Sequence, residues 1–67
     1  MSQPINHLQA IDEVHRCTLI YLNIKSSADL PSNEVIEKTV YLLGNLPRYQ
    51  HLNHYSIKLI IRRVRAI

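Results

Sequence analysis

Apolar residues recur at steps of three and four in three separate segments of this chain, the spacing of one face of an α-helix. The first segment has Leu8, Ile11, Val14, Cys17, Thr18, Tyr21 and Leu22 on that face. The second has Val35, Ile36, Thr39, Val40 and Leu43, and the third has Ile57, Ile60, Ile61, Val64 and Ile67. We therefore predict amphipathic helices over about residues 4–23, 33–43 and 54–66.

Residues suited to helix ends lie at the borders of these segments. Ser2 is expected to cap the first helix, with Pro4 in its first turn, where a missing N–H removes no intrahelical bond. Ser32 and Asn53 are expected to cap the second and third helices. Gly44, the sole glycine, follows the last periodic residue of the second segment, so we expect it to end that helix in the left-handed conformation.

Two stretches also fit a strand, because residues 17–24 and 56–67 are rich in β-branched and aromatic side chains. Three helices with short connections nevertheless form a self-consistent all-α fold, a small three-helix bundle in a single domain over residues 1–67. A chain of 67 residues buries a thin core, and a dimer would relieve that shortage. We expect a homodimer.

Charge is segregated along the chain, with all the acids in residues 1–44 and most of the bases after them. The acids are Asp12, Glu13, Asp29, Glu34 and Glu37. The last 23 residues contain no acid and carry Arg48, Lys58, Arg62, Arg63 and Arg65. Such a basic segment is a hint of an anionic partner, and it supports one hypothesis, a DNA-binding transcriptional regulator that sets these five side chains against phosphates.

The sequence offers little that resembles catalytic or metal-binding chemistry. His51 and His54 could approach one ion with His7 or His15, but neither a cysteine pair nor a carboxylate lies beside them in the sequence. One glycine cannot build a phosphate-binding loop. We therefore expect no enzymatic activity, no metal site and no cofactor.

The cellular setting is predicted from cysteine and hydropathy. Cys17 is alone, so no internal disulfide can form, and a reducing, cytoplasmic location is expected. No apolar stretch approaches the roughly 18 residues of a membrane span, and we expect no membrane partner.

The helices carry more apolar residues than their core faces need, and Leu19 and Ile20 of the first segment are among them. Tyr41, Leu42 and Leu59 lie outside the main stripes, and unhidden apolar patches mark interfaces. Tyrosines near a helix start are also typical of interfaces. The predicted partner-binding residues are Tyr41, Leu42, Tyr49, Tyr55 and Leu59. The favoured hypothesis is a small non-enzymatic regulatory protein that binds another protein and modulates its activity.

Overall fold

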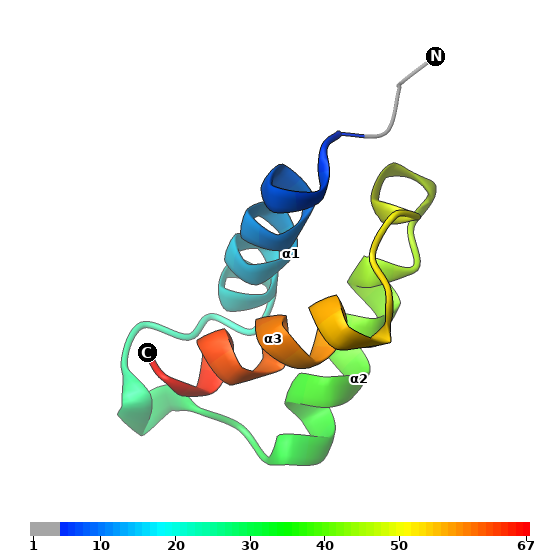
Figure 1. The fold of residues 1–67 in the computed structure, drawn as a ribbon. Coiled ribbons are helices and arrows are strands. Elements are labelled where there is room, and N and C mark those ends of the chain that lie inside the picture. Colours follow the sequence, from blue (N-terminus) through cyan, green and yellow to red (C-terminus); the bar gives the residue numbers. More distant parts are fainter. Residues whose placement is uncertain (1–4) are drawn as a thin grey trace.

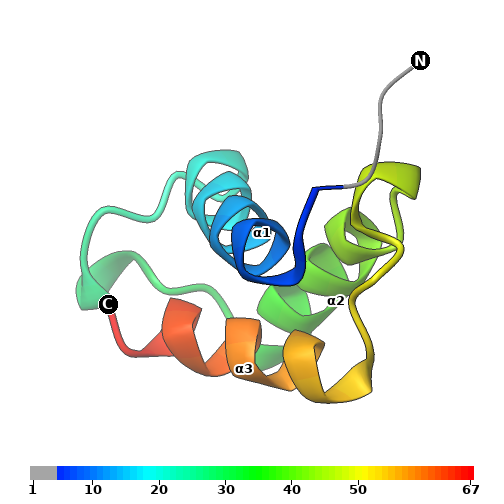
Figure 2. The same cartoon turned by 45° about the horizontal axis from the view of Figure 1, so that its top comes forward.

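The computed structural model describes residues 5–67 and contains three α-helices packed against one another within that range. Helix α1 spans His7–Tyr21, α2 spans Asn33–Gly44 and α3 spans His54–Arg65. Two 3₁₀ turns, η1 (Ser27–Asp29) and η2 (Pro47–Tyr49), lie in the connections. α1 and α2 run in roughly opposite directions and α3 crosses them (Figures 1 and 2). The predicted all-helical bundle is confirmed.

Side-chain caps set where each helix begins. The Asn6 Oδ1 accepts a hydrogen bond from the backbone N–H of Gln9 at 2.9 Å, so α1 begins at His7 and not at residue 4 as predicted. The expected cap Ser2 and the first-turn Pro4 lie outside the described residues. The other two predicted caps are confirmed, as Ser32 and Asn53 accept from the third residue of α2 and α3 respectively.

Helix α1 ends at Tyr21, two residues before the predicted boundary, because the chain turns into the left-handed region at Asn23, where φ is 55°. The N–H of Asn23 bonds to the carbonyl of Ile20, and the N–H of Ile24 bonds to the carbonyl of Leu19. These two bonds form a Schellman motif, and asparagine tolerates its left-handed position. The strand alternative for residues 17–24 is wrong, and so is that for 56–67, since α3 is helical through Arg65.

Gly44 serves a different purpose from the one predicted. It is the last residue of α2 and does not have a positive φ; Asn45 is the C-cap instead. A Cβ at Gly44 would lie 2.5 Å from Cδ1 of Ile57. The missing side chain at Gly44 therefore lets the end of the Ile57 side chain pack against α2 without having to shift, and it does not serve a left-handed turn.

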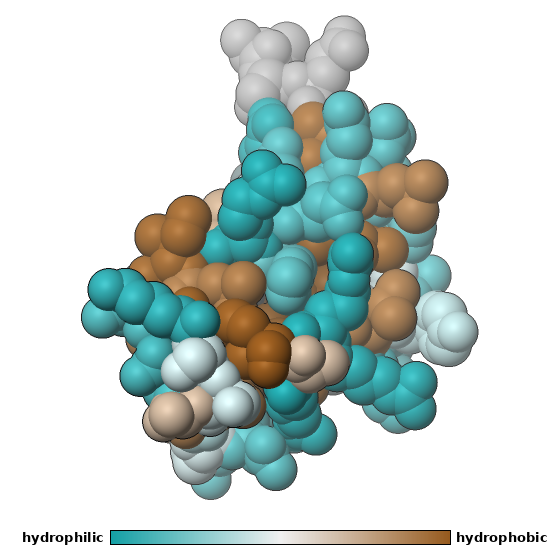
Figure 3. Space-filling view, turned by 90° about the vertical axis from the view of Figure 1, so that its left-hand side faces the viewer, coloured by the Kyte–Doolittle hydropathy of each residue, from teal (hydrophilic) through white to brown (hydrophobic). Residues whose placement is uncertain are grey.

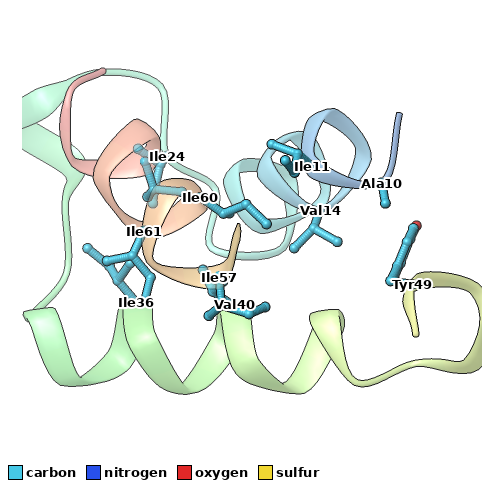
Figure 4. Packing of buried hydrophobic residues seen from close by; sticks show 11 residues of the cluster. Ala10, Ile11, Val14, Ile24, Ile36, Val40, Tyr49, Ile57, Ile60 and Ile61 are labelled. Atoms are coloured by element: carbon cyan, nitrogen blue, oxygen red, sulfur yellow. The ribbon is translucent and has the colours of Figure 1, made fainter. Parts of the chain in front are cut away.

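The core is built mainly from isoleucine and valine contributed by all three helices. Ile36 and Val40 of α2 point toward Ile57 and Ile61 of α3 (Figure 4). The buried hydrophobic residues are Ala10, Ile11, Val14, Ile24, Ile36, Val40, Tyr49, Ile57, Ile60, Ile61 and Val64.

Four residues predicted for the core stripes are exposed: Leu8, Tyr21, Val35 and Ile67. In α1 the smaller Ala10 lies in the core while Leu8 projects into solvent. Tyr21, Val35 and Ile67 lie at or near element ends, where covering by a neighbouring helix is incomplete. The helical period was correct in all three helices, but in α1 the buried stripe includes Ala10 in place of Leu8.

Within residues 5–67 no helix has the length and apolar character needed to cross a membrane.

Figure 3 shows one face of the molecule, on which hydrophobic groups reach the surface in several places between hydrophilic side chains.

We predict that Gly44→Ala lowers the free energy of unfolding by about 1 kcal/mol, because crowding in a packed core outweighs the better helix propensity of alanine. The matched background is Ile57→Val, which removes the Cδ1 atom that the new methyl group meets. In that background Gly44→Ala should be neutral or stabilising. Urea unfolding of the four proteins of this double-mutant cycle measures the coupling, and equal effects in both backgrounds would refute the close-approach explanation.

Candidate protein-interaction site

Most of the basic residues in the last third of the chain form ion pairs with acids of the first two helices. Nη1 of Arg63 lies 2.9 Å from Oδ1 of Asp12, which joins α3 to α1. Nη2 of Arg65 lies 2.9 Å from Oε2 of Glu37, which joins α3 to α2. Both pairs are partly exposed, so each stabilises the fold by about 1 kcal/mol or less. The charge segregation along the sequence is therefore largely neutralised within the fold.

A third pair joins η2 to α1 through a small network centred on Glu13. The Nε and Nη2 atoms of Arg48 donate to the two carboxylate oxygens of Glu13, each at 3.0 Å. The hydroxyl of Tyr49 donates to Oε1 of the same carboxylate at 2.8 Å. Hydrogen bonds from Arg48, and then from Tyr49, lower the pKa of Glu13 below its ordinary value of 4.5. Burial, and then the bond to Glu13, raise the pKa of Tyr49 to about 12.

Tyr49, one of the predicted partner-binding residues, is buried in the structure. Its side chain is only 6% exposed, and its ring lies next to Ala10 (Figure 4). The physical reason is the 3₁₀ turn of Pro47–Tyr49, which directs the ring inward while the hydroxyl finds the carboxylate of Glu13. Hydrophobic periodicity could not predict the burial of Tyr49, because a three-residue turn is too short to show a repeating pattern.

The four other predicted partner residues are exposed and form two stripes on α2 and α3. On α3, Tyr55, Lys58, Leu59 and Arg62 have the spacing i, i+3, i+4, i+7, which places them along one side of the helix. This stripe lies beside the core stripe that begins at Ile57. On α2, Lys38, Tyr41, Leu42 and Asn45 have the same spacing. Each helix therefore has a second, exposed stripe that mixes apolar and polar side chains.

Three shallow grooves connect these stripes into one surface. The first is lined by Glu34, Glu37, Lys38, Tyr41, Leu42 and Asn45. The second, between the helices, is lined by Glu37, Tyr41, Lys58, Ile61, Arg62 and Arg65. The third is lined by Tyr55, Lys58, Leu59 and Arg62. Glu37 and Tyr41 line both of the first two grooves, and Lys58 and Arg62 line both of the last two, so the grooves lie next to one another.

We call this surface the α2–α3 face and define it by Tyr41, Leu42, Tyr55, Lys58, Leu59 and Arg62. A side-chain contact fixes its two helices relative to each other, as the hydroxyl of Tyr41 lies 3.3 Å from Nδ1 of His54. Of the five basic residues predicted to contact nucleic acid, three carry the ion pairs described above. The other two, Lys58 and Arg62, lie on the α2–α3 face and have no salt bridge to an acid within residues 5–67.

The histidines are spread over several contacts. His54 contacts Tyr41, and Nε2 of His7 lies 2.8 Å from Oγ of Ser56. Burial, and then the charge of Arg63, lower the pKa of His15 below its ordinary value of 6.5. In the part of the chain that the structure describes, no three side chains of histidine, cysteine, aspartate or glutamate gather to hold a metal ion.

The contact between Ser56 and His7 has the distance of a nucleophile and its base, and no pattern in the sequence indicates it. The Ser56 side chain is only 1% exposed, however, and neither residue lines any of the three grooves described above. The hydroxyl of Ser56 also donates to Oδ1 of Asn53, the cap of α3, at 3.0 Å. This arrangement joins the first turn of α3 to the first residue of α1, which is a packing role.

No family model matches this chain, and no curated protein or solved structure shows significant similarity to it. Within residues 5–67 the chain is a three-helix bundle with an exposed amphipathic surface over α2 and α3.

We predict that Glu13→Gln destabilises the protein near neutral pH but not in acid. The folded protein lowers the pKa of Glu13, so its contribution is present above about 4.5 and is lost as the pH falls through the lower folded value. Urea unfolding of both proteins at about pH 7 and about pH 3 measures this. A difference of equal size at the two pH values would contradict the network.

The loss of folding stability at alkaline pH is tested by Tyr49→Phe. Because the pKa of Tyr49 is raised to about 12, its neutral form stabilises the fold below the ordinary value of 10.0, and this stabilisation is lost as the pH rises toward 12. We expect the wild type to lose stability over that range and the phenylalanine variant to lose less. Tyr55→Phe is the control, since Tyr55 is exposed and its loss should leave the alkaline transition unchanged.

Proposed function

We propose that this chain is a small non-enzymatic regulatory protein that binds another protein through the α2–α3 face and modulates its activity. The observation that supports the proposal is the exposure of large apolar side chains on two adjacent helices, beside three neighbouring grooves. Leu42 is 72% exposed. Exposed apolar groups beside grooves are typical of surfaces that a partner covers.

The distribution of charge also favours a protein partner over DNA. A phosphate-binding surface gains affinity with each cation it presents, and three of the five candidate cations are engaged by acids of the same chain. The remaining two alternate with Tyr55 and Leu59 along α3. Apolar side chains between cations suit a peptide better than a sugar–phosphate backbone.

The proposal includes a homodimer in the cytoplasm. Ile20 and Tyr21 of α1 are exposed apart from the α2–α3 face, and covering them by a second copy would add to a core of limited size. A reducing compartment agrees with the single cysteine, Cys17.

We predict that Leu42→Asp abolishes capture of the partner while Leu8→Asp does not. The two leucines are matched, being 72% and 74% exposed, so neither substitution should unfold the bundle, which circular dichroism checks. The immobilised full chain and both variants are incubated with extract of the source cells, and retained proteins are compared by mass spectrometry. The activity of the captured protein is then measured with and without the chain.

Two outcomes would contradict the proposal. The first is a set of captured proteins that is the same for the wild type and Leu42→Asp. The second is binding of mixed-sequence duplex DNA that weakens steeply with salt and is lost in a variant with Lys58→Glu and Arg62→Glu, which would favour the transcriptional regulator instead.

A further inference from the structure

The α3 side of the α2–α3 face differs in charge from its α2 side. On α2 the groove beside Leu42 contains acids as well as Lys38, and Lys38 lies 3.7 Å from Glu34. On α3 the groove beside Tyr55 and Leu59 contains two cations and no acid. The α3 groove is therefore a positively charged apolar site.

The surrounding acids do not neutralise these two cations. Glu37 lines the groove between the helices, but its carboxylate accepts from Arg65 at 2.9 Å. Asp12 likewise accepts a hydrogen bond from Arg63 of α3, and Glu13 accepts one from Arg48 of η2. Within residues 5–67, Lys58 and Arg62 thus form no salt bridge that an incoming carboxylate would first have to displace.

From this geometry we propose, resting on the function proposed above, that the partner presents an acidic amphipathic helix to the α3 groove. Lys58 and Arg62 are one turn apart, about 6 Å along the axis of α3. Carboxylates at positions i and i+3 or i+4 of a helix lying alongside α3 have the same spacing. An apolar side chain of that helix fits between Tyr55 and Leu59, and its neighbours extend over Tyr41 toward Leu42.

Each interaction has a distinct role in this complex. The apolar contacts with Tyr55 and Leu59 supply most of the buried surface, as in other helix-in-groove complexes. The guanidinium of Arg62 offers a paired fork to one carboxylate, whereas the ammonium of Lys58 acts as a point charge. The positive charges favour an acidic partner over a basic one and increase its association rate.

The experiment uses a displayed library of random peptides of about 16 residues, roughly four helical turns, selected on the immobilised full chain. Enriched peptides are synthesised and their dissociation constants measured by fluorescence anisotropy at about 0.05 and about 0.15 M salt. The test variant carries Lys58→Glu and Arg62→Glu. Its matched control carries Arg16→Glu and Lys25→Glu, which changes the net charge equally at two exposed cations away from the α2–α3 face.

We expect enriched peptides to share two acidic residues at i and i+3 or i+4 beside a leucine or another large apolar residue. Their affinity should fall at least about tenfold with the test variant and less than about twofold with the control. It should also weaken as salt rises. Circular dichroism should show helix formation of the peptide on binding.

Several outcomes would overturn the inference. Enrichment of uncharged or basic peptides whose binding is lost with Leu59→Asp would reject the acidic partner and leave the proposed protein-binding function intact. Failure to enrich any peptide, or binding of labelled duplex DNA that the test variant abolishes, would also reject it. The Leu42→Asp capture experiment reports separately on the proposed function, so the two failures are distinguishable.

Discussion

Burial of the Ile57, Ile60, Ile61 and Val64 stripe of α3 is the interaction on which the rest of the structure depends. All four residues are buried, and they form the contact between α3 and the other two helices. Fixing this stripe fixes the rotation of α3 about its axis. Every other side chain of the helix then has a set direction, because neighbouring positions differ by 100°. The absence of a Cβ at Gly44 allows α2 to approach this stripe closely.

The charges of the molecule follow from that rotation. Arg63 is directed to Asp12 on α1, and Arg65 to Glu37 on α2. Lys58 and Arg62, one turn apart on the remaining side, are left with Tyr55 and Leu59 as neighbours. The same packing that neutralises part of the basic segment therefore produces a surface on which cations and apolar groups alternate. A partner must match both properties.

Much of this fold could be predicted from sequence because its signals are local. Helical periodicity, and the side-chain caps Ser32 and Asn53, act within a few residues of where they occur. The left-handed Asn23 was missed since asparagine only tolerates that conformation, whereas the single glycine drew the same expectation and is needed for packing instead. The inward turn of Tyr49 and the acid partners of the arginines depend on residues about 30 to 50 positions away in the sequence.

Part of the candidate site could be predicted from the sequence and part could not. Surplus apolar residues indicated Tyr41, Leu42 and Leu59, and a position near the start of a helix indicated Tyr55; all four are exposed. The sequence does not separate the five basic residues from one another. Acids confined to the first 44 residues and bases concentrated after them are nevertheless the distribution that internal pairing between segments requires. Only the folded arrangement separates Lys58 and Arg62 from the three arginines that stabilise the bundle.

The most direct test of the α2–α3 face is to follow the backbone amide resonances of the ¹⁵N-labelled full chain while the captured partner, or the segment of it that binds, is added. Our account predicts that the changed resonances cluster at Tyr41 and Leu42 and along Tyr55–Arg62, while those of Asp12, Glu13 and their neighbours on α1 stay in place. Changes confined to α1, or spread evenly over the three helices, would contradict it.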